Sequence, residues 1–228
     1  MIDVRRMVEG DTVTLFDNAG TEYAGVIERI IGGGAGLSVN VRLATATQAD
    51  REPAVKIVLA TAIPKGERAD MMVQKCAELG CHTLVPMECR RSVVRFVDGR
   101  EGKIEKWRRI AMEASKQCGR DRIMEIAAPC PFKAVISMGA WAQQAAPPVS
   151  LGVICALTPD AKPLRNLLAQ KGHPKDITCL VGPEGGFTDE ELAQALTAGL
   201  HPATLARSVL RTETAAMAAV AIIGAEYL

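Results

Sequence analysis

Two short stretches near the end of the chain combine carboxylates, an arginine and small residues in a way that suits chemistry. The first, LVGPEGGFTDEEL at residues 180–192, is an apolar run followed by a turn that holds one carboxylate, Glu184. Glycine adopts positive φ and lets backbone approach a ligand closely, and this turn contains Gly182, Gly185 and Gly186. The stretch is therefore a candidate site in which backbone groups surround a ligand beside a carboxylate.

The same stretch predicts the start of a helix. Thr188 and Glu191 have the T-x-x-E spacing of a capping box, so the free N–H groups of the next helix point back toward the turn. A P-loop is excluded because no Lys-Ser or Lys-Thr pair follows the glycines. A tight strand-to-helix turn with a surface glutamate would have the same sequence, so the stretch alone leaves both interpretations open.

The second stretch, SVLRTETAAMAAVAIIGAEYL at residues 208–228, places Arg211 and Glu213 at the start of an alanine-rich helix. Small residues on such a helix let another helix or a ligand approach closely. The arginine and the glutamate could belong to a site, or they could form a local ion pair at the start of a buried terminal helix.

A basic tract precedes both stretches. Residues 90–122 contain eleven basic and five acidic side chains, a local net charge of +6 in a chain whose overall net charge is +1. Such a patch would favour RNA phosphate through counterion release. A solvated helix face has the same charge pattern, so charge alone does not decide.

The elements that must position these residues follow from the hydrophobic pattern. Residues 1–50 alternate apolar and polar side chains between turn signals at Asp17-Asn18 and GGGAG (32–36), which predicts a small antiparallel β unit. A dinucleotide-binding glycine loop is excluded because Leu37 stands where its last glycine belongs and no helix pattern follows. The polar stretch TQADREP (47–53) marks a domain boundary, so we expect domains at 1–50 and 51–228.

Beyond the boundary, strand and helix patterns alternate, which predicts an α/β domain with a parallel sheet covered by helices on both faces. Strands are expected at 55–62, 82–87, 123–128, 149–157, 176–182 and 202–206, and helices at 67–79, 101–118, 162–170, 188–198 and 212–227. Ligands in such folds bind at the carboxyl ends of the strands, which is where the glycine turn falls.

Composition limits the class of protein. With 48% hydrophobic and 23% charged residues, the chain is typical of a globular protein, and no apolar run reaches membrane-spanning length. The first residues lack the apolar core of a signal peptide, so we expect a cytoplasmic protein. The seven cysteines and three histidines show no paired ligand spacing, which argues against a metal site and for reduced thiols.

The two stretches together, LVGPEGGFTDEEL and VLRTETA, closely resemble the RsmE family of 16S ribosomal RNA uracil-N3 methyltransferases in the SPOUT superfamily. Residues 63–95 and WRRIAMEASKQCGR at 107–120 resemble the family as well, so the resemblance covers essentially the whole chain. It implies S-adenosylmethionine bound in a trefoil knot near the C-terminus, a homodimer, and a small PUA-like β-barrel domain in front that binds RNA together with the basic tract. It also implies that the substrate is 16S ribosomal RNA in the small subunit, whose decoding region the family modifies.

The resemblance assigns candidate roles to particular residues. Methylating uridine N3 requires removal of a proton and stabilisation of negative charge on the flanking carbonyls. The catalytic candidates are Arg211, Glu213, Glu184 and Arg120, and the choice of base between the two carboxylates stays open. The cofactor-binding candidates are Ala156, Leu157, Gly182, Glu184, Gly185, Gly186, Leu205, Leu210, Arg211, Thr212 and Ala215. The RNA-binding candidates are Arg90, Arg91, Arg95, Lys116 and Arg120.

Three departures from the family pattern stand out. Leu205-Ala206 replaces the usual Leu-Gly, Ser208 stands where a basic residue is common, and Arg207 lies one place earlier. The chain also begins at an internal part of the family's first domain, so we expect an incomplete β domain. A SPOUT methyltransferase acting on tRNA, or an RNA-binding protein with a degenerate knot and no catalysis, are the alternatives.

Overall fold

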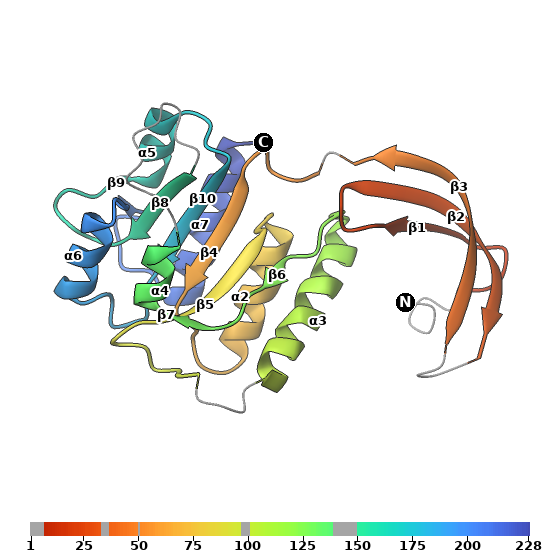
Figure 1. Cartoon of the computed structure of the whole chain (residues 1–228), viewed down its shortest axis with the longest axis horizontal. Helices are drawn as coiled ribbons and strands as arrows, with labels where there is room; N and C mark the ends of the chain where they lie inside the picture. Colours follow the sequence, from red (N-terminus) through yellow and green to blue (C-terminus); the bar gives the residue numbers. More distant parts are fainter. Residues whose placement is uncertain (1–6, 33–36, 50, 97–100, 139–149) are drawn as a thin grey trace. The chain divides into compact units, whose positions relative to one another are not determined.

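The antiparallel strands expected in the first part of the chain are present in the computed structural model, which describes residues 7–32, 37–49, 51–96, 101–138 and 150–228. They form a three-stranded sheet in the order β1 (Thr12–Phe16), β2 (Thr21–Ile31) and β3 (Ser38–Gln48) (Figure 1). The chain divides into two compact units, Met1–Arg51 and Glu52–Leu228, a boundary one residue from the one expected.

The side chain of Asp17 organises the first hairpin turn. Its Oδ1 accepts hydrogen bonds from the backbone N–H of Ala19 (2.7 Å) and of Thr21 (3.1 Å), while Asn18 takes a φ of 62°. Asp and Asn in these places are typical of tight turns. The turn residues 33–36 lie outside the described residues, but Ile31 pairs with Ser38 across an antiparallel ladder. The glycine-rich stretch therefore joins two strands, as predicted, and not a strand to a helix.

The second unit alternates strands and helices. Its elements are β4 (Lys56–Thr61), α2 (Glu67–Glu78), β5 (Thr83–Glu88), α3 (Glu101–Cys118), β6 (Glu125–Ile126), β7 (Cys130–Pro131), α4 (Phe132–Ser137), β8 (Ser150–Cys155), β9 (Lys162–Pro163), α5 (Leu164–Lys171), β10 (Asp176–Val181), α6 (Asp189–Thr197), β11 (His201–Thr204) and α7 (Thr212–Glu226). The sheet order is β6-β5-β4-β10-β8-β11-β9, β7 pairs with β5, and every pairing is parallel. The predicted α/β fold with a parallel sheet is confirmed.

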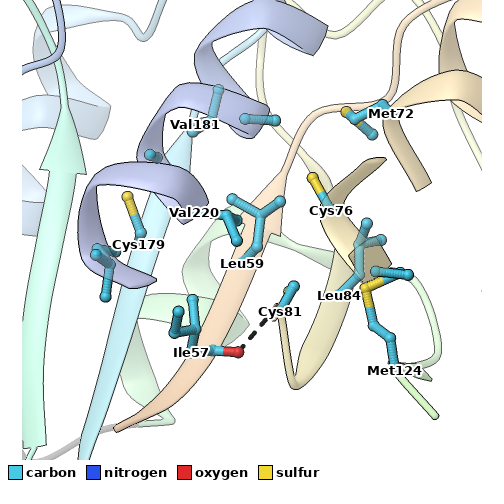
Figure 2. Packing of buried hydrophobic residues seen from close by; sticks show 14 of the residues in the cluster. Ile57, Leu59, Met72, Cys76, Cys81, Leu84, Met124, Cys179, Val181 and Val220 are labelled. Carbon is cyan, nitrogen blue, oxygen red and sulfur yellow. Dashed lines mark hydrogen bonds between the residues drawn. The ribbon is translucent and has the colours of Figure 1, made fainter. Parts of the chain in front are cut away.

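Two apolar layers cover the faces of this sheet. Along β10, Cys179 and Val181 enter the layer that contains α2, α3, α5 and α7, whereas Leu180 enters the layer that contains α4 and α6. Figure 2 shows part of the first layer, where Leu59 of β4 packs near Val220 of α7. Because both faces are buried, the central strands are continuous apolar runs, which is the pattern that predicted them.

Candidate active site

A cavity of about 360 Å³ opens at the carboxyl ends of β8, β10 and β11. The glycine turn and the segment that leads into α7 both line it, together with the end of β8. Of the expected cofactor-binding residues, ten line this cavity: Ala156, Leu157, Gly182, Glu184, Gly185, Gly186, Leu205, Leu210, Thr212 and Ala215. Arg211 is exposed and does not line it.

A hydrogen bond joins the two stretches. Thr212 Oγ1, in the first turn of α7, donates to the carbonyl of Gly182 at 3.1 Å. A Cβ at Gly182 would lie 3.0 Å from the buried ring of Phe187, so the turn closes tightly only with glycine there. Gly186 has a φ of 69° and donates to Pro183 O at 2.8 Å, which completes the turn.

The predicted capping box is present at the start of α6. Thr188 Oγ1 accepts from Glu191 N at 3.2 Å, and Glu191 Oε2 accepts from Thr188 N at 2.9 Å. The second oxygen of Glu191 accepts from Arg90 N at 2.7 Å. The same glutamate therefore caps the helix and holds the loop that follows β5.

The basic loop after β5 contacts the glycine turn through Arg91. Its Nη1 donates to the carbonyls of Gly185 (2.8 Å) and Phe187 (3.1 Å). Arg90 keeps an exposed side chain, and Arg95 donates to Arg90 O at 2.7 Å. The structure thus brings Arg90, Arg91 and Arg95 to the rim of the turn, with Arg91 committed to backbone carbonyls.

Lys116 and Arg120 lie elsewhere. Lys116, near the end of α3, pairs with Glu113 at 2.9 Å. Arg120 is 5% exposed, donates to Ala77 O and Cys81 O, and forms an ion pair with Glu52. Its guanidinium bonds to these groups in the protein interior and does not line the cavity. The catalytic and RNA-binding roles expected for Arg120 are therefore corrected to a structural one, because a sequence motif does not reveal burial.

Arg68, in the first turn of α2, is a site residue that the sequence reasoning missed. Its Nη1 lies 3.7 Å from Glu184 Oε1 and 3.7 Å from Glu213 Oε1. The alternative of a local pair between Arg211 and Glu213 is wrong, because Arg68 is the arginine beside Glu213. The position of Arg68 just after β4, at the same sheet edge as the glycine turn, was the available signal.

Two thiols lie beside the cavity. Cys155 Sγ, on the cavity wall, is 3.3 Å from Cys179 Sγ on the neighbouring strand. This hydrogen bond, together with burial, raises the pKa of the Cys179 thiol well above its usual value. Burial also raises the pKa of the Cys89 thiol, at the base of the basic loop, to about 12. The Cys179 and Cys89 thiols therefore stay protonated and act as small apolar groups.

The cavity lining suits a compact ligand with both apolar and polar groups. Small residues such as Ala156, Gly185 and Ala215 leave backbone groups within reach of a ligand. Thr158 Oγ1, on the wall, is buried and has no hydrogen-bond partner among the described residues. A buried polar atom without a partner calls for a ligand or water. Within the described part of the chain, no cluster of three or more His, Cys, Asp or Glu side chains could hold a metal ion.

A parallel sheet with a cavity at its strand ends places the protein among α/β enzymes that bind a ligand at the sheet edge. Residues 51–224 match the family model described as the RNA methyltransferase domain. The ribosomal RNA small subunit methyltransferase E of a Synechocystis species is 30% identical over 222 residues, which cover 97% of this chain and 68% of that protein. The enzyme of the same name from Bacillus subtilis is 28% identical over 98% of this chain and 85% of its own length.

Solved structures agree with these relatives. A ribosomal RNA small subunit methyltransferase E from Neisseria gonorrhoeae, bound to S-adenosyl methionine, is 26% identical with a TM-score of 0.82 and covers 99% of this chain and 87% of its own. A methyltransferase from Legionella pneumophila in complex with the cofactor SAM is 34% identical with a TM-score of 0.83, covering 98% and 86%. The chain belongs to the ribosomal RNA small subunit methyltransferase E family.

Proposed function

We propose that this protein uses S-adenosylmethionine to methylate N3 of a uridine in the 16S ribosomal RNA of the small subunit. The observation that carries the proposal is the convergence of both sequence stretches on one cavity at the strand ends, in a chain of this family. Relatives solved with the cofactor bound support the same ligand here.

The cavity fits this cofactor by the chemistry of its lining. Leu157, Leu205 and Leu210 offer apolar surface to an adenine, while the turn from Gly182 to Gly186 offers backbone N–H and C=O groups. Thr158 Oγ1 is a hydroxyl without a partner among the described residues. When bound, S-adenosylmethionine supplies an electrophilic methyl group on its sulfonium.

Residues of the chain then deprotonate the uridine and stabilise the charge that develops on it. N3 carries a weakly acidic proton that a carboxylate must accept, and Glu184 lines the cavity. Arg211 precedes α7 with an exposed guanidinium and no ion pair among the described residues. A planar donor fork of this kind can stabilise negative charge that develops on the uridine carbonyls.

RNA binding is assigned to basic side chains of the loop after β5 and of α3. Arg90 and Arg95 are the candidates beside the glycine turn, and Lys116 is the candidate on α3. The proposal also includes a trefoil knot near the C-terminus and a PUA-like role for the three-stranded unit. Both rest on the family to which the chain belongs.

The proposal extends to a cytoplasmic homodimer. Met217, Ala218, Ala221 and Ile222 are half-buried in the single chain and share one face of α7, so a second copy could cover them. Among the described residues, no helix is long and apolar enough to cross a membrane. Light scattering at micromolar concentration should give twice the 24.3 kDa of one chain, and a species of single mass would contradict the dimer.

The function is tested by incubating the purified protein and labelled S-adenosylmethionine with small ribosomal subunits, free 16S RNA and tRNA. We expect label in the small-subunit RNA, recovered as 3-methyluridine when nucleosides are analysed by mass spectrometry. Label in tRNA would favour the tRNA alternative. Calorimetry that detects no cofactor binding would favour the non-catalytic RNA-binding alternative.

A further inference from the structure

Three segments that are distant in the sequence meet at Arg68. The arginine lies in the first turn of α2, Glu184 lies in the turn after β10, and Glu213 lies in the first turn of α7. Both carboxylates approach Arg68 Nη1 to 3.7 Å, which is an ion-pair distance and longer than a hydrogen bond. The contact is therefore electrostatic, and the arginine is shared between the two glutamates.

The two glutamates differ in their surroundings. The side chain of Glu184 is 37% exposed and lines the cavity, whereas that of Glu213 is 5% exposed and does not line it. Glu213 Oε2 is buried without a hydrogen-bond partner among the described residues. A buried carboxylate interacts more strongly with a nearby cation than an exposed one does. Glu213 therefore fixes the arginine from the interior, and the arginine in turn faces Glu184.

From this arrangement we infer that Arg68 is a positioning residue, which Glu213 anchors and which holds Glu184 as the base of the reaction. The inference rests on the proposed function and chooses between the two carboxylates. The uridine N3–H bond breaks, its electron pair stays on N3, and the proton passes to a Glu184 oxygen. N3 then bonds to the methyl carbon of S-adenosylmethionine, and the pair of the broken carbon–sulfur bond stays on sulfur.

The test is a double-mutant cycle on the full chain with Arg68→Met, Glu184→Gln and the double variant. Single-turnover methyl transfer should fall about 10²-fold or more in each single variant. The double variant should be no slower than Glu184→Gln, because Arg68 acts through that glutamate. Affinity for S-adenosylhomocysteine should change less than about threefold. Arg68→Lys should recover part of the rate, because it restores the charge without the planar fork.

Glu67→Gln is the matched control. Glu67 is an exposed carboxylate in the same helical turn and has no ion pair among the described residues, so its loss should leave the rate unchanged. Losses that multiply in the Arg68 and Glu184 double variant would overturn the inference. A parallel loss of S-adenosylhomocysteine affinity in Arg68→Met would also overturn it, because Arg68 would then belong to the binding pocket itself.

A second cycle keeps the inference separate from the proposed function. Arg68→Met, Glu213→Gln and their double variant are compared by denaturant unfolding, which requires no activity. Non-additive changes in the midpoint would support the anchoring of Arg68 by Glu213, and additive changes would overturn it. If the wild-type protein transfers no methyl group to ribosomal RNA, the proposed function fails, and this cycle still decides whether the pair exists.

Discussion

Arg211 and Arg207 are two exposed arginines on the segment that leads into α7, but only Arg211 directly precedes the helix. The next residue, Thr212, is tied to Gly182 O at 3.1 Å, so the backbone at Arg211 is held against the cavity. A side chain on a fixed backbone loses less conformational entropy when it binds the transition state. Donors that stabilise developing charge act best when they are held in place in this way.

Arg211→Ala should therefore lower turnover about 10²–10³-fold, the typical cost of one donor to developing charge, with a much smaller effect on cofactor affinity. Arg207→Ala is the control, because it removes an equal charge from the same segment. Turnover and calorimetry on both variants make the comparison. Equal losses of rate and cofactor affinity in Arg211→Ala would mean that Arg211 is a binding or structural residue.

Individual site residues were predictable where the backbone conformation requires a particular residue type. Gly182 and Thr188 were predicted because turns and caps demand particular residue types. Arg68 was missed because its role depends on two carboxylates from distant segments. Arg120 was misplaced for a related reason, since its partner Glu52 is 68 residues away and burial cannot be read from a motif.

At the level of elements, the glycine turn depends on the basic loop beside it. Arg91 donates to two carbonyls of the turn, and Glu191 holds Arg90 N. The long strands and helices were predicted because their apolar patterns extend over many residues. The short elements β7, α4 and β9 were missed, because two to six residues carry no period and form only when neighbouring elements are in place.

Arg91→Ala and Arg90→Ala should therefore separate two functions of the same loop. Loss of the Arg91 guanidinium leaves two carbonyls of the turn without their donor, so cofactor affinity should fall by about tenfold. Among the described residues, the hydrogen bonds of Arg90 come from its backbone N–H and C=O, so Arg90→Ala should leave cofactor affinity unchanged and weaken RNA binding with a reduced salt dependence. Calorimetry with cofactor and RNA titrations at two salt concentrations would measure both. Identical behaviour of the two variants would contradict this division.

The turn itself offers a second prediction at this scale. Gly182→Ala would place a Cβ 3.0 Å from the Phe187 ring, which is 7% exposed and has little room to move. Overpacking typically costs about 1–3 kcal/mol, so we expect thermal stability and cofactor affinity both to fall. Gly102→Ala is the control, because the added Cβ on this exposed glycine of α3 would meet no atom within 4 Å beyond the neighbouring backbone of its own helix. This substitution should raise helix stability slightly. Unchanged cofactor affinity in Gly182→Ala would show that the turn tolerates a side chain.

At the scale of the whole molecule, the chain divides where the polar stretch near residue 50 predicted. Every residue that lines the cavity lies in Glu52–Leu228. The ends of that unit are also joined, because Ala54 N donates to Tyr227 O at 2.9 Å and Glu52 pairs with buried Arg120. The boundary could be predicted from composition. The ion pair between Glu52, the first residue of this unit, and Arg120 could not.

Residues 52–228 produced alone should therefore fold and bind S-adenosylmethionine within about twofold of the full chain, since both apolar layers lie within this unit. RNA affinity should fall, because the resemblance assigns part of RNA binding to the β unit.

The same fragment with Glu52→Ala tests where the unit begins. It leaves the guanidinium of Arg120, 5% exposed, without its carboxylate, and breaking a buried ion pair on one side typically costs about 3–5 kcal/mol. Denaturant unfolding and calorimetry on the two fragments would measure these effects. A fragment that begins at Glu52 and fails to fold, or that is indifferent to Glu52→Ala, would show that the catalytic unit does not begin at this ion pair.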